Sequence, residues 1–492
     1  MSTQRERERP LRIAIVGAGP GGLCAAIELQ RAGFEDTLIL EKSSGVGGTW
    51  WHNRYPGACC DVESALYSFS FEPKLDWSKP YGTQAELQAY FEHCAAKYHL
   101  APRLRLETEV RAAEWSEERG RWTLTTRSGE RFEADAVVSA VGMFNELHWP
   151  SIPGLEAFAG TLFHSARWNT QHELRGRRVG VIGSAASAVQ FVPEIAREVA
   201  QLHLFQRSAN WVLPKEDTPF SAAELAAFRA DPALARERRE RVFGEIEGII
   251  TFSNPARLRA AEQVGLRALA AVEDPALRRK LTPTHPYGCK RPLLSNDYFP
   301  TFNRANVELV TDAIERVSAD AIHTRDGRAR RVDTIVVATG FETTRYASVL
   351  DVVGRSGLRL ADAWKDAAEA YLGVSTPGFP NFFMLYGPNT NNGSILYMIE
   401  AQVSHLVALL KRIRAERLAC LDLRRDALER YNAALQRDIA GVAVWQAGCN
   451  GYYRSPSGRV VTQWPHTMSE YRRRSDAQDP DAYEAQPLPA PA

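Results

Sequence analysis

The chain has 492 residues, of which 45% are hydrophobic and 24% are charged, which is typical of a globular protein. Its 60 basic residues nearly balance its 59 acidic residues, so we expect neither a nucleic-acid partner nor attachment to a membrane surface. No apolar run reaches the roughly 18 residues that would span a bilayer, and the N-terminus lacks the apolar stretch of a secretory signal. We therefore expect a cytoplasmic protein that contains several structural units.

The first motif in the chain is the glycine-rich turn GAGPGG at 17–22, between an apolar run over 11–16 and a helical pattern over 23–30. This is the context that the GxGxxG dinucleotide-binding motif requires. Glu41 follows the next apolar run, and its carboxylate can accept hydrogen bonds from an unphosphorylated ribose, as in FAD. The residues assigned to this site are Gly17, Ala18, Gly19, Gly21, Gly22, Glu41 and Lys42.

A second turn of the same plan, GSAASA at 183–188, follows the apolar run at 178–182. Alanine replaces the second glycine, and Ala185 is tolerable there only if its φ is negative. Arg207 lies 24 residues after Gly183, the interval that also separates Gly17 from Glu41, and an arginine there suits the 2′-phosphate of NADPH. The residues assigned to this site are Gly183, Ser184, Ala185, Ala186, Ser187, Arg207 and Ser208.

The two turns predict an α/β fold with two dinucleotide-binding (Rossmann-like) domains, the second inserted in the first and carrying a helical insertion. We expect the FAD-binding domain over 1–150 and, together with a C-terminal segment, over 331–485. The NADPH-binding domain is expected over 151–330, with the helical insertion at about 217–285. The residues 486–492 are expected to be a disordered, polyproline-like tail.

Three smaller patterns complete this organisation. Ser221 and Glu224 have the spacing of a capping box at the start of the helical insertion. The Arg/Glu run at 236–241 is typical of a solvated helix face. The seven cysteines show no CxxC pair and no metal-site spacing, so we expect reduced thiols and no bound metal.

The segment FAGTLFHSARW at 158–168 matches the pattern FxGxxxHxxxW and lies between the two nucleotide turns. With GGTWWHNRYPGACCD at 47–61 and GCKRPLLSNDYFPTFNR at 288–304, it resembles the Baeyer–Villiger monooxygenase family, class B flavoprotein monooxygenases that use FAD and NADPH. The chain departs from the family pattern at Asn169, where Pro or Asp is usual, and at Tyr452 and Tyr453, where a Trp-Tyr pair is common.

The resemblance implies that NADPH reduces FAD, that O₂ then gives a flavin peroxide, and that oxygen is inserted next to a ketone carbonyl to form an ester or lactone. It identifies Arg291 as the catalytic arginine and Asp61 as its acidic partner. An arginine suits this chemistry because it stays charged and offers several hydrogen-bond donors. The resemblance also implies cofactor contacts at Gly48, Thr49, Trp50, Asp61, Tyr67, Val110, Asn389 and Lys290.

His164 and Trp168, the last two fixed residues of the FxGxxxHxxxW pattern, lie in the expected link between the domains. We assign them to domain movement rather than to proton transfer, with a buried structural histidine as the alternative for His164. Lys290, by its match, would help Arg207 to hold the 2′-phosphate.

Three other functions share part of this pattern. A flavin monooxygenase that oxidises nitrogen or sulfur has both nucleotide sites, but Arg291 and the complete FxGxxxHxxxW pattern favour ketone oxidation. A flavin disulfide reductase requires a pair of redox cysteines, and the chain has no CxxC. A non-catalytic nucleotide sensor would need neither the arginine nor the oxygen-handling segments.

Overall fold

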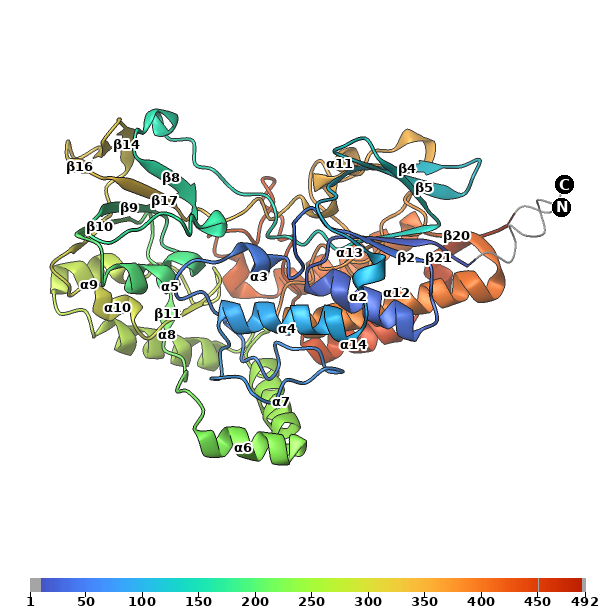
Figure 1. The fold of residues 1–492 in the computed structure, drawn as a ribbon, viewed down its shortest axis with the longest axis horizontal. Helices are drawn as coiled ribbons and strands as arrows, with labels where there is room; N and C mark the ends of the chain where they lie inside the picture. Colours follow the sequence, from blue (N-terminus) through green and yellow to red (C-terminus); the bar gives the residue numbers. More distant parts are fainter. Residues whose placement is uncertain (1–9, 450, 489–492) are drawn as a thin grey trace.

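The computed structural model describes residues 10–449 and 451–488, and its core is built on two five-stranded parallel sheets (Figure 1). The first sheet has the strand order β19-β7-β1-β2-β3. Its strands are β1 (Ile13–Val16), β2 (Thr37–Leu40), β3 (Leu104–Arg105), β7 (Ala136–Ser139) and β19 (Phe382–Met384). The strands β1, β7 and β19 are short and fully buried, which is typical of parallel sheets covered on both faces.

The alternation of side chains along β1 explains how the first sheet is covered. Ile13 and Ile15 pack into the core that includes α2 (Pro20–Arg31) and α12 (Ile395–Glu416). Ala14 and Val16 point to the opposite face, into a core with Trp122 and Leu124. That second core is covered by the small sheet of β4 (Val110–Ser116), β5 (Arg121–Thr126), β6 (Arg131–Ala134) and β18 (Asp351–Val353).

The second sheet repeats this plan with the order β13-β10-β9-β17-β8. Its strands are β8 (Thr161–His164), β9 (Arg178–Ile182), β10 (Gln201–Phe205), β13 (Val307–Val310) and β17 (Thr334–Val337). Val179 and Val181 pack with α5 (Ala186–Ile195), while Ile182 packs on the other side with Ile322. That side is covered by β14 (Ile314–Val317), β15 (Ala321–Thr324) and β16 (Ala329–Arg331).

The expected domain boundary at residues 330 and 331 is wrong. The apolar strand near residue 335 was assigned to the first nucleotide domain, but β17 pairs in parallel with both β9 and β8 of the second sheet. The chain rejoins the first sheet only at β19, which pairs with β7. The apolar pattern predicted a buried strand correctly but carried no information on its partners, because any parallel core strand has the same composition.

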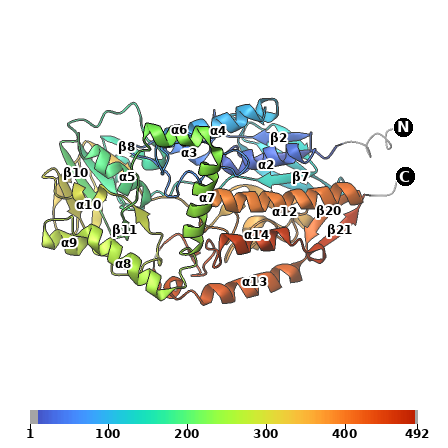
Figure 2. The same ribbon diagram turned by 90° about the horizontal axis from the view of Figure 1, so that it is seen from below.

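The helical segment expected at 217–285 is present as four helices. They are α6 (Ala222–Ala230), α7 (Pro232–Glu247), α8 (Pro255–Leu269) and α9 (Pro275–Leu281). The capping box of Ser221 and Glu224 is formed at the start of α6, and α7, α8 and α9 each begin with a proline after an Asp or Asn cap. Figure 2 shows α7 between α8 on one side and α12 and α14 (Met468–Asp476) on the other.

The expectation of a solvated face over 236–241 holds only in part. Arg238 forms an ion pair with Glu63 at 2.5 Å. The Nη1 atom of Arg239 donates to the carbonyl oxygens of Ala65 at 2.9 Å and Ser68 at 3.0 Å. These two arginines therefore fasten α7 to the segment that follows Asp61, a contact that a charge pattern cannot foresee because it depends on a partner far away in the sequence.

Two further expectations are corrected by the structure. The end of the chain is not free from residue 486, because β21 (Tyr483–Pro487) pairs antiparallel with β20 (Leu418–Leu423). The last four residues of the expected tail, 489–492, lie outside the described residues. The seven cysteines are not all reduced, because the fold brings the α-carbons of Cys289 and Cys449 to 6.0 Å and their sulfurs form a disulfide across 160 residues.

The longest of the described helices, α12, carries several charged residues. It has 22 residues, but Lys411, Arg412 and Arg414 lie on its C-terminal half. Among the described residues, no helix combines the length and the apolar character needed to cross a membrane.

Two crossings, the chain segments that lead from β7 to β8 and from β17 toward β19, connect the two sheets and run side by side. Leu147 and Phe341 form a β-bridge, and the backbone N–H of His148 donates to the carbonyl of Gly340 at 2.9 Å. His164, at the end of β8, is buried against Phe341 and Trp149, one aromatic ring from each crossing. Its assignment to domain movement stays a prediction.

His164 is a neutral side chain at physiological pH. Its Nδ1 atom accepts a hydrogen bond from the backbone N–H of Ala166 at 3.1 Å, and burial lowers the pKa of His164 to about 4. In contrast, Trp168 packs against Phe163 and Phe191 in the core of the second sheet.

We expect the free energy of unfolding of His164→Asn to decrease less on acidification than that of the unchanged protein. Between the folded pKa of about 4 and the unfolded pKa of about 6.5, only the unfolded chain binds this proton. The free energy of unfolding therefore falls as the pH decreases through this window and is independent of this group above it. The contribution to the slope is at most about 1.4 kcal/mol per pH unit.

Urea unfolding across this pH range measures the slope. His99→Asn is the control, since His99 is exposed and has a positive φ that asparagine tolerates. If the free energy of unfolding depended equally on pH in the two variants, a low pKa of His164 in the folded protein would be contradicted.

Candidate active site

The first glycine-rich turn joins β1 to α2. Gly17 has a φ of +106°, and a Cβ atom there would lie 2.6 Å from the carbonyl oxygen of Ala140. Glu41 is buried beside the turn, and its Oε2 atom accepts from the backbone N–H of Ala18 at 2.7 Å. The predicted pairing of glycine turn and acidic strand end is therefore present, and the helix N-terminus that follows suits a pyrophosphate.

A second glycine loop lies against this turn. Gly48 has a φ of +55°, and a Cβ atom on it would lie 2.8 Å from the Cα atom of Gly19. The N–H of Gly47 donates to the carbonyl of Ala18 at 2.9 Å. The two bare backbones touch and form a glycine cradle that a side chain on Gly48 would push apart, and α3 (Thr49–His52) begins directly after it. Bare backbone at such a turn lets a dinucleotide cofactor approach closely.

The second nucleotide turn has the same geometry. Gly183 has a φ of +109°, and a Cβ atom there would lie 2.4 Å from the carbonyl oxygen of Ala338. Ala185 has a φ of −96°, so the condition set for an alanine at this place is met without backbone strain. Ala185 and Ala186 are exposed at the start of α5, where unpaired backbone N–H groups are available to an anion.

Two cations lie close together near this second turn. Arg207 is exposed directly after β10, and the ammonium group of Lys290 donates to the hydroxyl of the neighbouring Ser208 at 2.8 Å. Burial and the charge of Arg207 lower the pKa of Lys290. Two repelling cations with exposed donors fit a phosphate monoester such as the 2′-phosphate of NADPH.

Arg291 and Asp61 form the central ion pair. The Nε and Nη2 atoms of the guanidinium both donate to Oδ2 of Asp61, with a distance of 2.9 Å for Nε. About a third of each side chain is accessible to solvent. The charge of Asp61 raises the pKa of Arg291 well above its usual value, so position 291 carries a permanent positive charge.

Aromatic hydroxyl groups surround this cation. Tyr67 accepts a hydrogen bond from Nε1 of Trp50 at 3.2 Å and contacts its ring edge-on. Burial raises the pKa of Tyr386 and of Tyr453, so both phenols stay neutral in the electrostatic environment of Arg291. The hydroxyl of Tyr386 donates to Oδ1 of Asn391 at 2.6 Å. The Cys289–Cys449 disulfide ties the Arg291 segment to the chain that carries Tyr453.

The remaining predicted contacts occupy distinct positions. Thr49 is the first residue of α3, and Val110 begins β4. Lys42 is exposed and donates to the side-chain oxygen of Asn145. The side-chain amide of Asn389 donates to the carbonyls of Val460 and Gln463, so it orders the C-terminal segment. Their cofactor roles stay predictions.

The sequence did not predict the contacts that join the loop of Tyr55 and Cys59 to the elements around the second sheet. Gln190, on α5, accepts from the hydroxyl of Tyr55 at 2.9 Å and donates to the carbonyl of Cys59 at 3.0 Å. Lys215 approaches the sulfur of Cys59 at 3.2 Å and pairs with Asp217. No local spacing signals these contacts, because each partner is separated from the other by more than a hundred residues, apart from the Lys215–Asp217 pair.

Comparison with known proteins gives consistent matches. The family model described as pyridine nucleotide-disulphide oxidoreductase matches residues 14–223. Baeyer–Villiger monooxygenases of Pseudomonas aeruginosa and Streptomyces coelicolor are each 40% identical to the chain, over its whole length and over 95% and 96% of the relatives. A phenazine N-monooxygenase of Lysobacter antibioticus is 34% identical over 87% of each protein.

The solved structures agree with the sequence relatives. Cyclohexanone monooxygenase from Rhodococcus sp. Phi1, bound to NADP⁺, has a TM-score of 0.88 and 30% identity, and the match covers 98% of this chain and 100% of that one. An α/β architecture built on parallel sheets is therefore shared along nearly the full length.

We expect Gly48→Ala to weaken FAD binding by at least about tenfold, because the methyl group would enter the cradle at Gly19 and the backbone strain costs about 1–3 kcal/mol. The measurement is the FAD dissociation constant of the deflavinated protein, followed by flavin fluorescence. Gly129→Ala is the matched control: Gly129 also has a positive φ, but no atom lies within 4 Å of its added Cβ. Equal affinities for the two variants would exclude the cradle.

Proposed function

The chain belongs to the Baeyer–Villiger monooxygenase family and is an FAD- and NADPH-dependent oxidoreductase; from this premise we propose that it inserts oxygen beside the carbonyl of a ketone, with Arg291 as the catalytic cation and Asp61 as the residue that positions it. The observation that carries the proposal is the ion pair between these two residues, in which Nε and Nη2 of Arg291 both donate to Oδ2 of Asp61. It joins positions that are 230 residues apart in the sequence.

The location of the ion pair supports this role. On one side, Tyr67 connects the surroundings of Arg291 to Trp50, which follows the Gly48 cradle. On the other side, the adjacent Lys290 reaches Ser208 beside Arg207. Arg291 therefore lies between the region proposed to hold FAD and the region proposed to hold NADPH, where hydride donor and oxygen chemistry have to meet.

The protein's own contribution is charge and position. When bound, NADPH supplies the hydride and FAD supplies the redox chemistry that activates O₂. Negative charge develops on oxygen before and after attack on the ketone carbonyl, and the fixed guanidinium of Arg291 stabilises it without solvent reorganisation. Asp61 holds two of the guanidinium N–H groups, which leaves the others free to donate toward that oxygen.

The proposed substrate class is a ketone, with O₂ as the co-substrate. It is supported by the family and by a solved relative, a cyclohexanone monooxygenase with ε-caprolactone bound, whose match has a TM-score of 0.86 and 30% identity. The neutral phenol of Tyr453, near Arg291, supplies a donor for a carbonyl oxygen.

We expect Arg291→Ala to lower kcat for ketone oxygenation by about 10²–10³ while FAD is still bound and NADPH is still oxidised. Product formation by gas chromatography and NADPH consumption are measured on the same sample. Arg178→Ala is the matched control, since Arg178 is also an ion-paired arginine, held by Asp333 in the second sheet. Unchanged lactone or ester formation by the Arg291 variant would remove the residue from the mechanism.

Oxidation of nitrogen or sulfur is a second candidate, favoured by the similarity to the phenazine N-monooxygenase. An amine or sulfide attacks oxygen as the electron-rich partner, so this reaction does not depend on a stabilised negative oxygen. The same Arg291 variant separates the two candidates: under the ketone proposal, sulfide oxidation declines much less than ketone oxygenation. A wild-type protein that oxidises amines or sulfides but no ketone would favour the second candidate.

We expect Arg207→Ala to narrow the preference for NADPH over NADH by about 10–100-fold, because one charge-assisted contact to the 2′-phosphate is worth about 1.5–3 kcal/mol. The ratio of kcat/KM for the two nucleotides is the measurement. Arg197→Ala is the control, since this exposed arginine of the same domain pairs with Glu194. An unchanged ratio in the Arg207 variant would show that other residues read the phosphate.

The domain arrangement and location complete the proposal. The first sheet and its neighbours would form the FAD domain, with the second sheet inserted as the NADPH domain from about residue 151 to about 340, as the strand pairings support. The proposed location is the cytoplasm, supported by five free cysteines among the described residues. The Cys289–Cys449 disulfide is the feature that argues against that location.

A further inference from the structure

A cavity outside the candidate active site lies between the segment 65–80 and the helices α6 and α7. Its volume is about 80 Å³, and it is partly open to solvent. Four aromatic side chains form much of its wall: Phe69, Trp77, Phe220 and Phe228. The rings of Phe220 and Phe228 meet edge-to-face at 5.4 Å. A mostly apolar lining with a few polar groups is typical of sites for small organic molecules.

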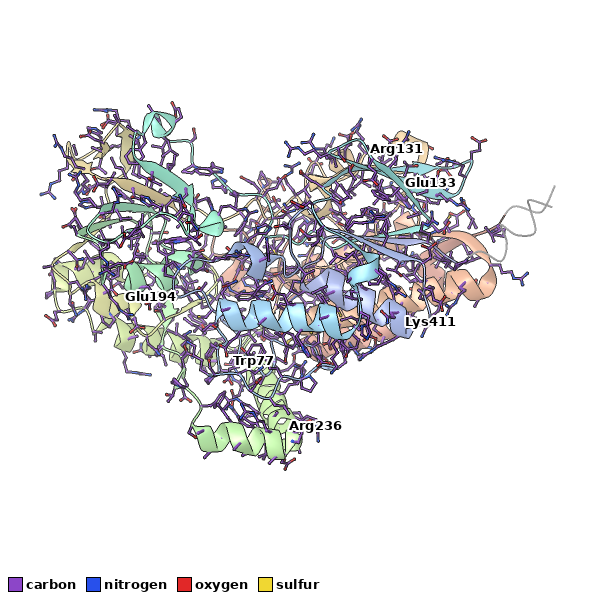
Figure 3. All side chains as sticks on the ribbon, in the orientation of Figure 1. Trp77, Arg131, Glu133, Glu194, Arg236 and Lys411 are labelled. Atoms are coloured by element: carbon purple, nitrogen blue, oxygen red, sulfur yellow. A yellow bond between two sulfur atoms is a disulfide. The ribbon has the colours of Figure 1, made fainter. Side chains whose placement is uncertain are left out.

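Helix α4 (Gln84–Lys97) separates this cavity from the cofactor loops. Gln84 and Gln88 donate to the carbonyls of Trp50 and Val46 in the glycine-loop region. Another face of the helix, at Tyr90, packs against Phe69 and Trp77 of the cavity wall. In Figure 3, Trp77 lies below α4, and Arg236 lies toward the lower end of the molecule on the α7 segment. The cavity is thus distinct from the space between the two nucleotide turns.

The charges that line the cavity are of one sign. Five of the lining residues are basic and none is acidic: Lys74, Lys79, Arg236, Arg238 and Arg239. Carboxylates outside the lining neutralise three of them, with Asp76 on Lys74, Asp217 on Lys79 and Glu63 on Arg238. Neither Arg236 nor Arg239 forms an ion pair with another described residue.

Two donors on the wall have no acceptor. The Nη2 atom of Arg239 and the Nε1 atom of Trp77 are buried and lack a hydrogen-bond partner within the described part of the chain. Buried donors are normally paired, so two unpaired donors on residues that line one cavity point to an acceptor from a ligand. Glu400 lies near Arg239, but its carboxylate accepts from the backbone N–H of Ser70 at 2.6 Å, and burial raises the pKa of Glu400.

We propose that this cavity is a second binding site that takes an amphipathic carboxylate, with its apolar body between Phe69, Trp77 and Phe228 and its head group bound by Arg239. A guanidinium recognises a carboxylate with charge-assisted hydrogen bonds, which a neutral alcohol of the same length cannot form as strongly. The aromatic wall accounts for the apolar body, and the excess of basic lining residues accounts for the anionic head.

The test is isothermal titration of the FAD-loaded protein with octanoate at saturating NADP⁺, with 1-octanol as the uncharged comparison. We expect one octanoate site, with 1-octanol bound at least about tenfold more weakly. Arg239→Gln and Ala235→Phe, which places a ring among the lining residues of α7, should each weaken octanoate by about tenfold or more. Arg131→Gln, on β6 away from the cavity (Figure 3), should bind octanoate like the unchanged protein.

Arg239 also holds backbone carbonyls, so its variant could lose folding as well as binding. Trp77→Phe, which keeps a ring but removes the unpaired N–H, and Ala235→Phe then carry the test, with circular dichroism to establish that they are folded. Octanoate binding that is unchanged in both, equal binding of 1-octanol, or no octanoate binding to the unchanged protein would each overturn the proposal.

Discussion

An ion pair between Arg291 and Asp61 is the interaction on which the functional account depends. A guanidinium alone at this place would swing with its segment, whereas a carboxylate that accepts from both Nε and Nη2 fixes its plane. Because about a third of the pair faces solvent, its charges are hydrated enough to be tolerated yet close enough to act on a neighbouring oxygen. Asp61 follows helix α3 and Arg291 follows helix α9, so the pair forms only when these distant segments have been brought together by the fold.

The two sheets explain how such distant segments meet. Each follows the same plan, with a parallel sheet, a glycine turn at one strand end and a helix that starts at that turn. The crossings between them run side by side, and Gln190 and Lys215 attach the loop at Cys59 to the second domain. The turn regions and the Arg291 segment thereby converge, although no stretch of sequence contains more than one of them.

Local sequence patterns predicted what local chemistry dictates. The first turn with Glu41, the second turn with a negative φ at Ala185, and the capping box of Ser221 are all formed as expected, because each depends on a few neighbouring residues and on backbone geometry. What the sequence could not give depends on long-range pairing. The sheet that β17 joins, the strand at the end of the chain, the Cys289–Cys449 disulfide and the inward side of Arg239 all require the partner to be known.

A crystal structure of the protein with FAD and NADP⁺ bound tests the central claim most directly. The quantity to measure is the position of the Arg291 guanidinium relative to the isoalloxazine ring, with Asp61 as the internal reference. The account predicts that the guanidinium faces the ring within hydrogen-bonding reach of an oxygen placed over it, while Asp61 still accepts from Nε and Nη2. A guanidinium that points away from the ring in every copy, with its remaining N–H groups bound elsewhere in the protein, would contradict it.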